Sequence, residues 1–395
     1  MPGIPGLALW YHEAMNPTHT SKQQIDREAI PSLYLHVPFC ASICYYCDFA
    51  RQIYRRETVD AWLKAIQTEL ESVQPSHSLE TIYIGGGTPS SLSEDQLETL
   101  LCLLDSYRTE TKEYTVELNP ETVSEEKLNC LKRHGVNRLS IGIQSGDEAL
   151  LARMNRKHTK ADIHRLVVQI NACGFSNISM DLIYGLPNET MKQVEADLNY
   201  VLDLKPTHLS LYSLSIEPGS VFGKQGVQPI DEDLEAEMYE SIVRRLLQEG
   251  YEHYEVSNFA RPGKQSIHNR NVWQYKDFIG IGYGAWGKEG NVRYDHAGSL
   301  QAYLKNPCYR EKVLLSDLER QFETLMMGLR LSEGVFLKQY QEQFGCLPAD
   351  TFPVSIAKGI RRGYLEEEKD MLRCTGQGME LLNSILVEFM EEAEV

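Results

Sequence analysis

Long hydrophobic runs, an excess of basic residues and a disulfide pattern are all missing from this sequence. No stretch approaches the ~20 apolar residues that a membrane-spanning helix needs. No Lys or Arg precedes the apolar residues 1–11, as one would in a signal peptide. Lys and Arg number 39 against 56 Asp and Glu, a net charge of −17 that argues against nucleic-acid binding. We therefore expect a cytoplasmic protein with at most peripheral membrane contact, with residues 1–30 as a poorly ordered leader and Met15 as an alternative start.

The cysteines separate into two groups. Six of the nine are scattered singly, which does not resemble a disulfide framework and suits a reducing compartment. The others, Cys40, Cys44 and Cys47, have a C-x3-C-x2-C spacing directly after a short apolar run. Thiolates are the usual ligands of a [4Fe–4S] cluster, and three of them would leave one iron open to a small molecule. From the spacing alone, a zinc site completed by His36 or Asp48, or a disulfide with one free thiol, stays open.

Short apolar stretches alternate with amphipathic ones from residue 32 to about 215. This alternation predicts βαβ units and a parallel sheet, and six units suffice for an open (βα)6 TIM-like barrel. Strands are expected at 32–36, 80–84, 113–118, 138–144, 177–183 and 208–214, and helices near 57–73, 94–106, 125–134, 160–173 and 190–203. Ser93 and Ser124, each followed by two acidic residues, are the expected starts of two of these helices.

Unusual residues follow the predicted strands, where barrels of this kind place their chemistry. The three cysteines follow the first strand, Gly85-Gly-Gly-Thr-Pro89 the second, and Glu117, Gln144 and Asp181 lie at or near the ends of the next three. The glycine stretch lacks the Gly-Lys-Ser/Thr of a phosphate-binding loop, but it lets bare backbone approach a ligand. Each residue alone also suits a plain turn or a solvated carboxylate, whereas their convergence on one rim predicts a ligand site.

Together these residues resemble the radical S-adenosylmethionine superfamily. The resemblance implies a partial (βα)6 barrel in which Cys40, Cys44 and Cys47 hold a [4Fe–4S] cluster and S-adenosylmethionine chelates the open iron. The residues that it implies for the S-adenosylmethionine pocket are Tyr34, Tyr46, Gly86, Gly87, Thr88, Glu117, Gln144, Arg156 and Asp181. In agreement, Asp181 can accept from both ribose hydroxyls and Arg156 can hold a carboxylate.

Within that superfamily the chain resembles the oxygen-independent coproporphyrinogen III oxidase family over most of its length. The stretches that show this include Val116-Glu-Leu-Asn-Pro120, Ser140-Ile-Gly-Ile-Gln144 and Met180-Asp-Leu-Ile-Tyr-Gly-Leu-Pro187. Oxidases of the family carry a fourth cysteine two positions after the third, where this chain has Phe49.

A second stretch indicates the HemW-type haem chaperone branch of that family. His268-Asn-Arg-Asn-Val-Trp273 resembles its H-N-x-x-Y-W signature, with Val272 in place of the tyrosine. An imidazole beside an indole suits a haem, so His268 and Trp273 are the expected haem contacts. The resemblance implies haem as cargo and haem-accepting respiratory membrane proteins as partners, and a homodimer stays open. The alternative is an oxidase that decarboxylates a porphyrinogen.

The last part of the chain is expected to be mostly helical. The helical pattern grows from about residue 231, and we expect a barrel domain at 31–300 and a small winged-helix-like domain at 301–395. The latter would contain a hairpin near 364–375 and a final helix through 379–390. Residues 315–395 hold 15 acidic and 8 basic residues, a net charge of −7 that favours a cap or a protein-binding surface over a DNA duplex. An RNA-modifying radical enzyme would need a basic domain, which is missing.

Overall fold

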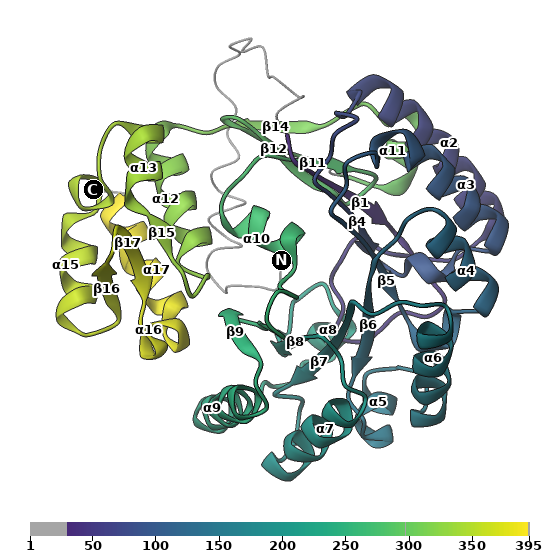
Figure 1. Ribbon diagram of the computed structural model, residues 1–395, viewed down its shortest axis with the longest axis horizontal. Helices are drawn as coiled ribbons and strands as arrows, with labels where there is room; N and C mark the ends of the chain where they lie inside the picture. Colours follow the sequence, from purple (N-terminus) through teal and green to yellow (C-terminus); the bar gives the residue numbers. More distant parts are fainter. Residues whose placement is uncertain (1–29, 297, 394–395) are drawn as a thin grey trace.

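The computed structural model describes residues 30–296 and 298–393, so the expected leader lies almost entirely outside the described residues. Six parallel strands form its centre, in the order β1-β4-β5-β6-β7-β8 (Figure 1). They are β1 (Ser32–Val37), β4 (Thr81–Gly86), β5 (Glu113–Leu118), β6 (Arg138–Gln144), β7 (Ile178–Tyr184) and β8 (His208–Ser213). Each bound lies within two residues of the prediction, and the partial (βα)6 barrel is confirmed.

Helices on the outside of the barrel connect the strands (Figure 1). They are α2 (Arg56–Val73), α3 (Glu94–Leu104), α4 (Glu125–Arg133), α6 (Lys160–Ala172) and α7 (Met191–Asp203). Ser93 and Ser124 are the residues that cap α3 and α4, as predicted, and the Ser124 hydroxyl accepts from the Lys127 amide at 3.2 Å. The leucines of α3 at 97, 100, 101 and 104 are buried on one face, and burying each contributes about 1.5–3 kcal/mol.

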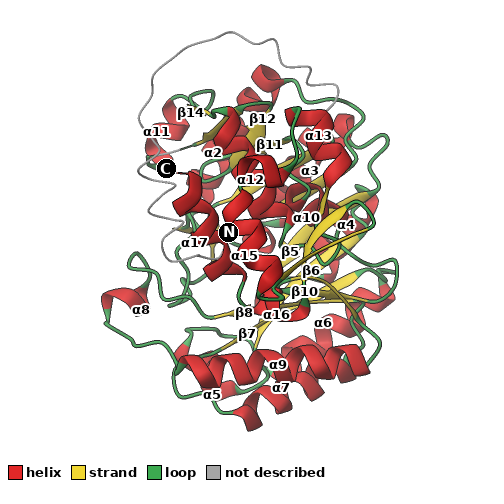
Figure 2. Ribbon diagram, turned by 90° about the vertical axis from the view of Figure 1, so that its left-hand side faces the viewer, coloured by secondary structure: helices red, strands yellow, loops and turns green. Residues whose placement is uncertain are grey.

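The sheet continues past both edges of the barrel to twelve strands. Beyond β1 lie β11 (Phe278–Ile281), β12 (Trp286–Glu289), β13 (Val292–Asp295) and β14 (Glu311–Leu314), and beyond β8 lie β10 (Asn258–Ala260) and β9 (Glu252–Glu255). The sequence analysis did not predict these six added strands. The helical pattern expected from about residue 231 corresponds to α9 (Glu232–Gln248), which lies beside α7 (Figure 2). The sequence hides these strands because they are short and because charged residues such as Lys288 and Arg293 are buried in them.

A second hydrophobic core lies in the C-terminal part, at the left of Figure 1. Its helices are α12 (Asp317–Gly328), α13 (Leu337–Phe344), α14 (Pro348–Thr351), α15 (Pro353–Arg361), α16 (Gly376–Glu380) and α17 (Leu382–Ala393). Its strands, β15 (Val335–Phe336), β16 (Leu365–Glu368) and β17 (Met371–Cys374), form a separate three-stranded sheet. The winged-helix-like outline and the hairpin at 364–375 are confirmed, but Leu381 interrupts the predicted last helix.

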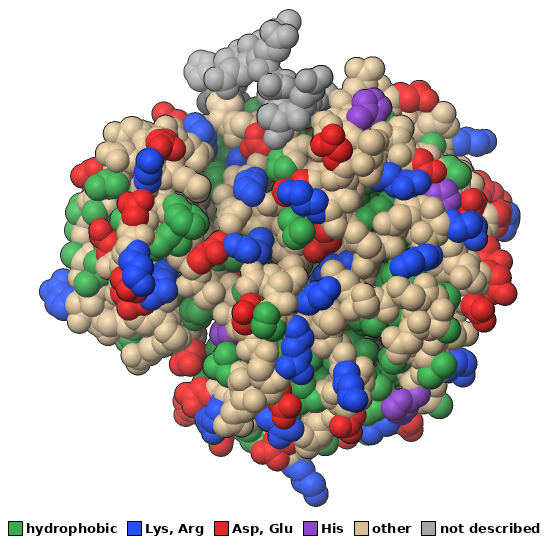
Figure 3. Space-filling view, viewed as in Figure 1, with side chains coloured by type: hydrophobic (Ala, Val, Ile, Leu, Met, Phe, Trp, Pro, Cys, Tyr) green, Lys and Arg blue, Asp and Glu red, His purple; other side chains and the backbone are tan. Residues whose placement is uncertain are grey.

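The proposed domain boundary needs one adjustment. The large sheet extends through β14 as far as Leu314, since β14 pairs with β13. The second core is built from α12 onward, with Tyr275 joining it from the barrel side. We therefore place the proposed change of domain near residue 315 instead of 300. None of the helices formed by the described residues has the length and apolar character needed to cross a membrane, and charges of both signs are interspersed over the face in Figure 3.

Candidate functional site

A closed loop after β1 holds the three motif cysteines. The two-residue strands β2 (Phe39–Cys40) and β3 (Gln52–Ile53) pair in parallel and join the two ends of this loop. Cys40 is buried at its base, and Cys44 and Cys47 are half-buried within it. The pKa of Cys40 is raised to about 11, chiefly by burial and also by the neighbouring thiols Cys47 and Cys44, while the Thr88 hydroxyl acts in the opposite direction. Thiols so close together ionise at neutral pH when a metal centre takes the charge.

The alternatives to a cluster lose support in this geometry. All nine cysteines lie in the described residues and all are free, so the disulfide hypothesis is wrong. Both ring nitrogens of His36 already have hydrogen-bond partners. Its Nε2 lies 2.8 Å from the Ala50 carbonyl and its Nδ1 lies 3.0 Å from the Tyr34 hydroxyl. Burial lowers the pKa of His36 to about 4. The three thiols fit a cluster with one open iron better than a closed zinc site.

The glycine stretch after β4 passes directly beneath the cysteine loop. A Cβ atom at Gly87 would lie 2.9 Å from the carbonyl oxygens of Val37 and Phe39 and 3.0 Å from the sulfur of Cys40. The Gly87 amide donates to the Val37 carbonyl at 2.8 Å, and the Thr88 hydroxyl donates to the Cys40 sulfur at 3.6 Å. Glycine is required here by close approach of two backbones, and Thr88 touches one of the three predicted cluster ligands directly.

A buried arginine connects the loop to the ends of the strands. Nη1 of Arg156 lies 3.8 Å from the sulfur of Cys44, and its Nη2 donates to the Gly142 carbonyl at 2.7 Å and to Oδ1 of Asn119 at 3.0 Å. Nδ2 of Asn119 in turn donates to the Thr88 hydroxyl at 2.9 Å. The sequence analysis missed Asn119. Its position two residues after Glu117 could have revealed it, because such residues share one side of a strand.

Two carboxylates lie inside the barrel near this network. Glu117 accepts from the Tyr83 hydroxyl at 2.8 Å and from the Gly86 amide at 3.0 Å, and burial raises its pKa to about 7. Asp181 accepts from the hydroxyls of Ser140 and Ser179 at 3.1 and 3.2 Å, and burial raises its pKa as well. Both carboxylates present acceptor oxygens of the kind that a ligand's hydroxyl or ammonium groups need.

Two more observations bear on the fit to S-adenosylmethionine. Oε1 of Gln144 and Nε of Arg156 are two of several buried side-chain atoms in the described residues that have no hydrogen-bond partner, and these two lie at the predicted site. Polar atoms of this kind are rare in folded proteins and are explained by a missing ligand or water. An acceptor and a cationic donor suit the ammonium and carboxylate groups of the cofactor, so the residues present fit it.

The two tyrosines predicted for the pocket are both half-buried but have different neighbours. Tyr34, in the middle of β1, is half-buried beside Tyr83 with ring centroids 6.0 Å apart. Tyr46, in the cysteine loop, packs against a small apolar cluster that includes Leu150 and Met154. Burial, with Cys44 next, raises the pKa of Tyr46 well above its usual range. Tyr46 is therefore part of the loop itself. Tyr34 contacts the loop only indirectly, through His36, whose other ring nitrogen lies near the Ala50 carbonyl.

The structure does not place His268 and Trp273 together. Both lie on α10 (Ile267–Trp273), five residues apart, which is roughly 140° around a helix. The His268 imidazole points into the amino end of the barrel, where its Nδ1 lies 2.9 Å from the Thr81 hydroxyl and its ring 5.0 Å from that of Tyr83. Trp273 faces the second core, with the Arg330 guanidinium 4.5 Å from its ring. Their roles in haem contact stay predictions.

The Glu117 carboxyl gives a pH-dependent prediction. Its folded-state pKa of about 7 exceeds the ordinary 4.5, so the folded protein binds the proton more tightly than the unfolded chain does. The stabilisation of the folded state by this tighter proton binding is fully present below pH 4.5 and is lost as the pH rises to 7. Compared with Glu117→Gln, the wild-type protein should therefore lose about 1–3 kcal/mol of unfolding free energy across this window. Urea unfolding of both proteins from pH 4.5 to 7.5 measures the difference, and parallel pH curves would contradict it.

Comparisons with known proteins identify the superfamily of this chain. Residues 34–201 match the family model of the radical SAM superfamily, and residues 315–381 match that of the HemN C-terminal domain. With the barrel and the three-cysteine loop, this defines the chain as a radical SAM protein with a HemN-type C-terminal domain. A [4Fe–4S] cluster and S-adenosylmethionine are the cofactors that this superfamily implies.

Full-length relatives narrow the assignment to one family. The heme chaperone HemW of Lactococcus lactis subsp. lactis is 38% identical over 368 residues, which cover 91% of this chain and 97% of the relative. That of Escherichia coli is 33% identical over 375 residues and 98% of its length. The chain belongs to the HemW family, as the sequence motifs predicted. The solved coproporphyrinogen III oxidase HemN from Escherichia coli shares the fold, with a TM-score of 0.81 over 97% of this chain and 98% of that one at 22% identity.

Proposed function

We propose that this protein is a cytoplasmic haem chaperone that binds haem and delivers it to respiratory haemoproteins at the membrane. The main support is the full-length similarity to relatives that are named heme chaperones. A second observation favours the carrier over the oxidase of the same family. Phe49 occupies the position of the oxidases' fourth cysteine, and its side chain is 49% exposed at the surface of the cysteine loop. An apolar ring there suits contact with a flat, apolar cargo.

The cluster would be held by Cys40, Cys44 and Cys47, and S-adenosylmethionine by the nine pocket residues at the strand ends. When bound, the cluster can supply one electron to S-adenosylmethionine. The protein's own residues would mainly organise the loop. Arg156 joins it to β6 through the Gly142 carbonyl, and Thr88 joins it to β4. Filling the site would therefore order the loop that bears Phe49.

The proposed role of His268 depends on an opening of α10. Burial, with Arg138 next, lowers the pKa of His268 to about 3, so the imidazole is neutral and its nitrogens are able to ligate iron. Its Nδ1 lies near Thr81, and among the described residues no hydrogen bond engages Nε2. Haem would reach Nε2 only after α10 moves away from the barrel, since the side chain is 4% exposed.

Haem titration of the cluster-loaded protein tests the carrier. We expect the wild-type protein to bind haem and His268→Ala to bind it at least about 10-fold more weakly, because an axial ligand is lost. His164→Ala, which removes an exposed histidine of α6, is the matched control and should bind like wild type. Haem absorbance measures the affinity, and circular dichroism checks the fold. Equal affinity of all three proteins would remove His268 from the site.

A turnover assay decides between carrier and oxidase. The cluster-loaded protein is incubated without oxygen with coproporphyrinogen III, S-adenosylmethionine and a reductant, and mass spectrometry follows loss of propionate carboxyl groups. We expect no product from protein that holds its full complement of iron. Product formation that is absent from Cys44→Ala would make the chain an oxidase despite Phe49.

A further inference from the structure

Two neighbouring helices outside the barrel bring together a set of metal-ligating side chains that the function above does not use. Helix α3 contributes Glu98 and Cys102. Helix α4 contributes Cys130, and His134 is the residue that caps the C-terminal end of α4. Within each pair the residues are four apart, so both side chains lie on one face of their helix. The two faces meet where α3 packs against α4.

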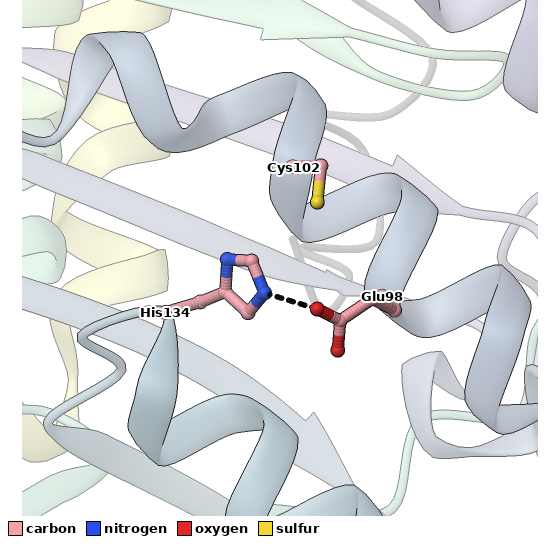
Figure 4. Close-up of side chains that lie close together, drawn as sticks. All are labelled: Glu98, Cys102 and His134. Carbon is pink, nitrogen blue, oxygen red and sulfur yellow. Dashed lines mark hydrogen bonds and ion pairs between the residues drawn. The ribbon is translucent and has the colours of Figure 1, made fainter.

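The donor atoms already lie close to one another. One ligand atom each of Glu98, Cys102 and His134 lies within 4.8 Å of the other two. Nε2 of His134 lies 3.0 Å from Oε1 of Glu98, and the Cys130 thiol donates to Oε2 of the same carboxylate at 3.0 Å. Figure 4 shows the imidazole and the carboxylate facing each other from the two helices, with the Cys102 thiol one helical turn from Glu98. Three of the four donors therefore form a compact group, and the Cys130 thiol adjoins it through Glu98.

The histidine is oriented as metal-bound histidines are. Nδ1 of His134 lies 3.0 Å from both oxygens of Asp105, which leaves Nε2 directed toward Glu98. Asp105 is itself held by Nε of Arg108 at 2.7 Å. In metal sites the second ring nitrogen of a histidine commonly donates to such a carboxylate, which sets the tautomer and the direction of the ring.

We propose that Glu98, Cys102, Cys130 and His134 bind a zinc-type divalent ion that joins α3 to α4. A set of two sulfurs, one nitrogen and one oxygen suits zinc, and four protein ligands make a closed, structural site. On binding, both thiols lose their protons to solvent and His134 binds as the neutral imidazole. The bound set then carries one net negative charge, and Nη2 of Arg133 lies 2.7 Å from Oε2 of Glu98 to balance it.

The competing occupant of this place would be a proton on His134. Hydrogen bonds from Cys130 and His134 lower the pKa of Glu98 to about 2, so its carboxylate is ionised. A protonated His134 between Glu98 and Asp105 would then satisfy the same oxygens. A site that holds zinc and a site that holds only a proton differ in zinc content. Measuring zinc therefore tests the proposal independently of haem and cluster chemistry.

The test uses the cluster-loaded protein, so that the three cluster cysteines are unavailable to added metal. The protein is equilibrated with zinc chloride without oxygen, desalted, and analysed for zinc and iron by mass spectrometry. We expect about one zinc ion per chain in wild type. We expect Cys102→Ser and His134→Gln to bind zinc at least about 10-fold more weakly in competition with a chromophoric chelator, at unchanged iron content. Cys308→Ser removes another exposed thiol and should match wild type.

Two results would overturn the site. One is a wild-type protein that retains no zinc. The other is equal retention by wild type, Cys102→Ser and His134→Gln, which would assign the zinc to other residues. Because Cys102 is exposed, Cys102→Ser should fold normally, and circular dichroism of each variant shows whether it does. Asp105→Asn should lower the affinity for zinc about 10–100-fold, because the His134 imidazole loses the carboxylate that orients it.

Discussion

Replacement of Cys44 by alanine is expected to abolish the iron–sulfur cluster. Cys44 is one of the three thiols on the closed loop, and no other cysteine belongs to that loop. Two remaining thiolates cannot hold three irons of the cluster, so iron content and the broad absorbance near ~400 nm should both fall close to the background level. Affinity for S-adenosylmethionine should fall with them, because in the proposed site the open iron would be one of its contacts.

Cys173→Ala is the matched control for this experiment. Cys173 is half-buried like Cys44 but lies at the end of α6, where its thiol contacts Asn129. Iron analysis and absorbance spectra of both variants, reconstituted side by side, make the measurement. A colourless wild-type protein that holds one zinc ion in this loop would show that the cluster assignment is wrong. Full iron content in Cys44→Ala would show that another ligand replaces the thiolate.

Glu113→Ala should lower the free energy of unfolding by about 3–5 kcal/mol. The Glu113 carboxylate is 2% exposed and holds the start of α10 at the amino end of the barrel. It accepts from the Ser266 hydroxyl at 3.0 Å and from the amides of Ile267 and His268 at 2.9 Å each. It also lies 4.0 Å from the guanidinium of Arg138. Alanine would leave these donors and a buried cation without their acceptor.

Glu195→Ala supplies the surface control for this substitution. Glu195 is exposed on α7, so its removal should change stability by no more than about 0.5 kcal/mol. Urea unfolding followed by circular dichroism compares both variants with wild type. Glu113→Gln should fall between them, because it keeps one acceptor oxygen but loses the charge. A loss below about 1 kcal/mol in Glu113→Ala would mean that other contacts hold α10 in place.

Substitution of Glu113 also tests the proposed route by which haem reaches His268. Since Glu113 fixes the helix that carries His268, a weaker anchor should make Nε2 of His268 easier to reach. The proposed opening of α10 then requires that folded Glu113→Gln binds haem faster than wild type. Equal rates would separate haem entry from this helix.

Much of the fold was predictable from contiguous stretches of sequence. Period-two and period-3.6 apolar patterns, with capping residues such as Ser124, specify elements through neighbours a few residues away. The spacing of Cys40, Cys44 and Cys47 and the glycines beside them likewise indicated a metal loop before any long-range contact was known. The strands that escaped prediction, such as β12 and β13, contain three or four residues and bury charges, so no local pattern marks them.

Only the tertiary structure decided which side chains meet. Asn119 and Arg156 are 37 residues apart, and Thr81 and His268 are 187 apart, yet each pair is within hydrogen-bonding distance. Sequence reasoning predicted His268 and Trp273 as neighbouring haem contacts, whereas α10 turns one into the barrel and the other toward the second core. Such choices depend on how whole elements pack, because burial and partner geometry act between residues that no local window contains.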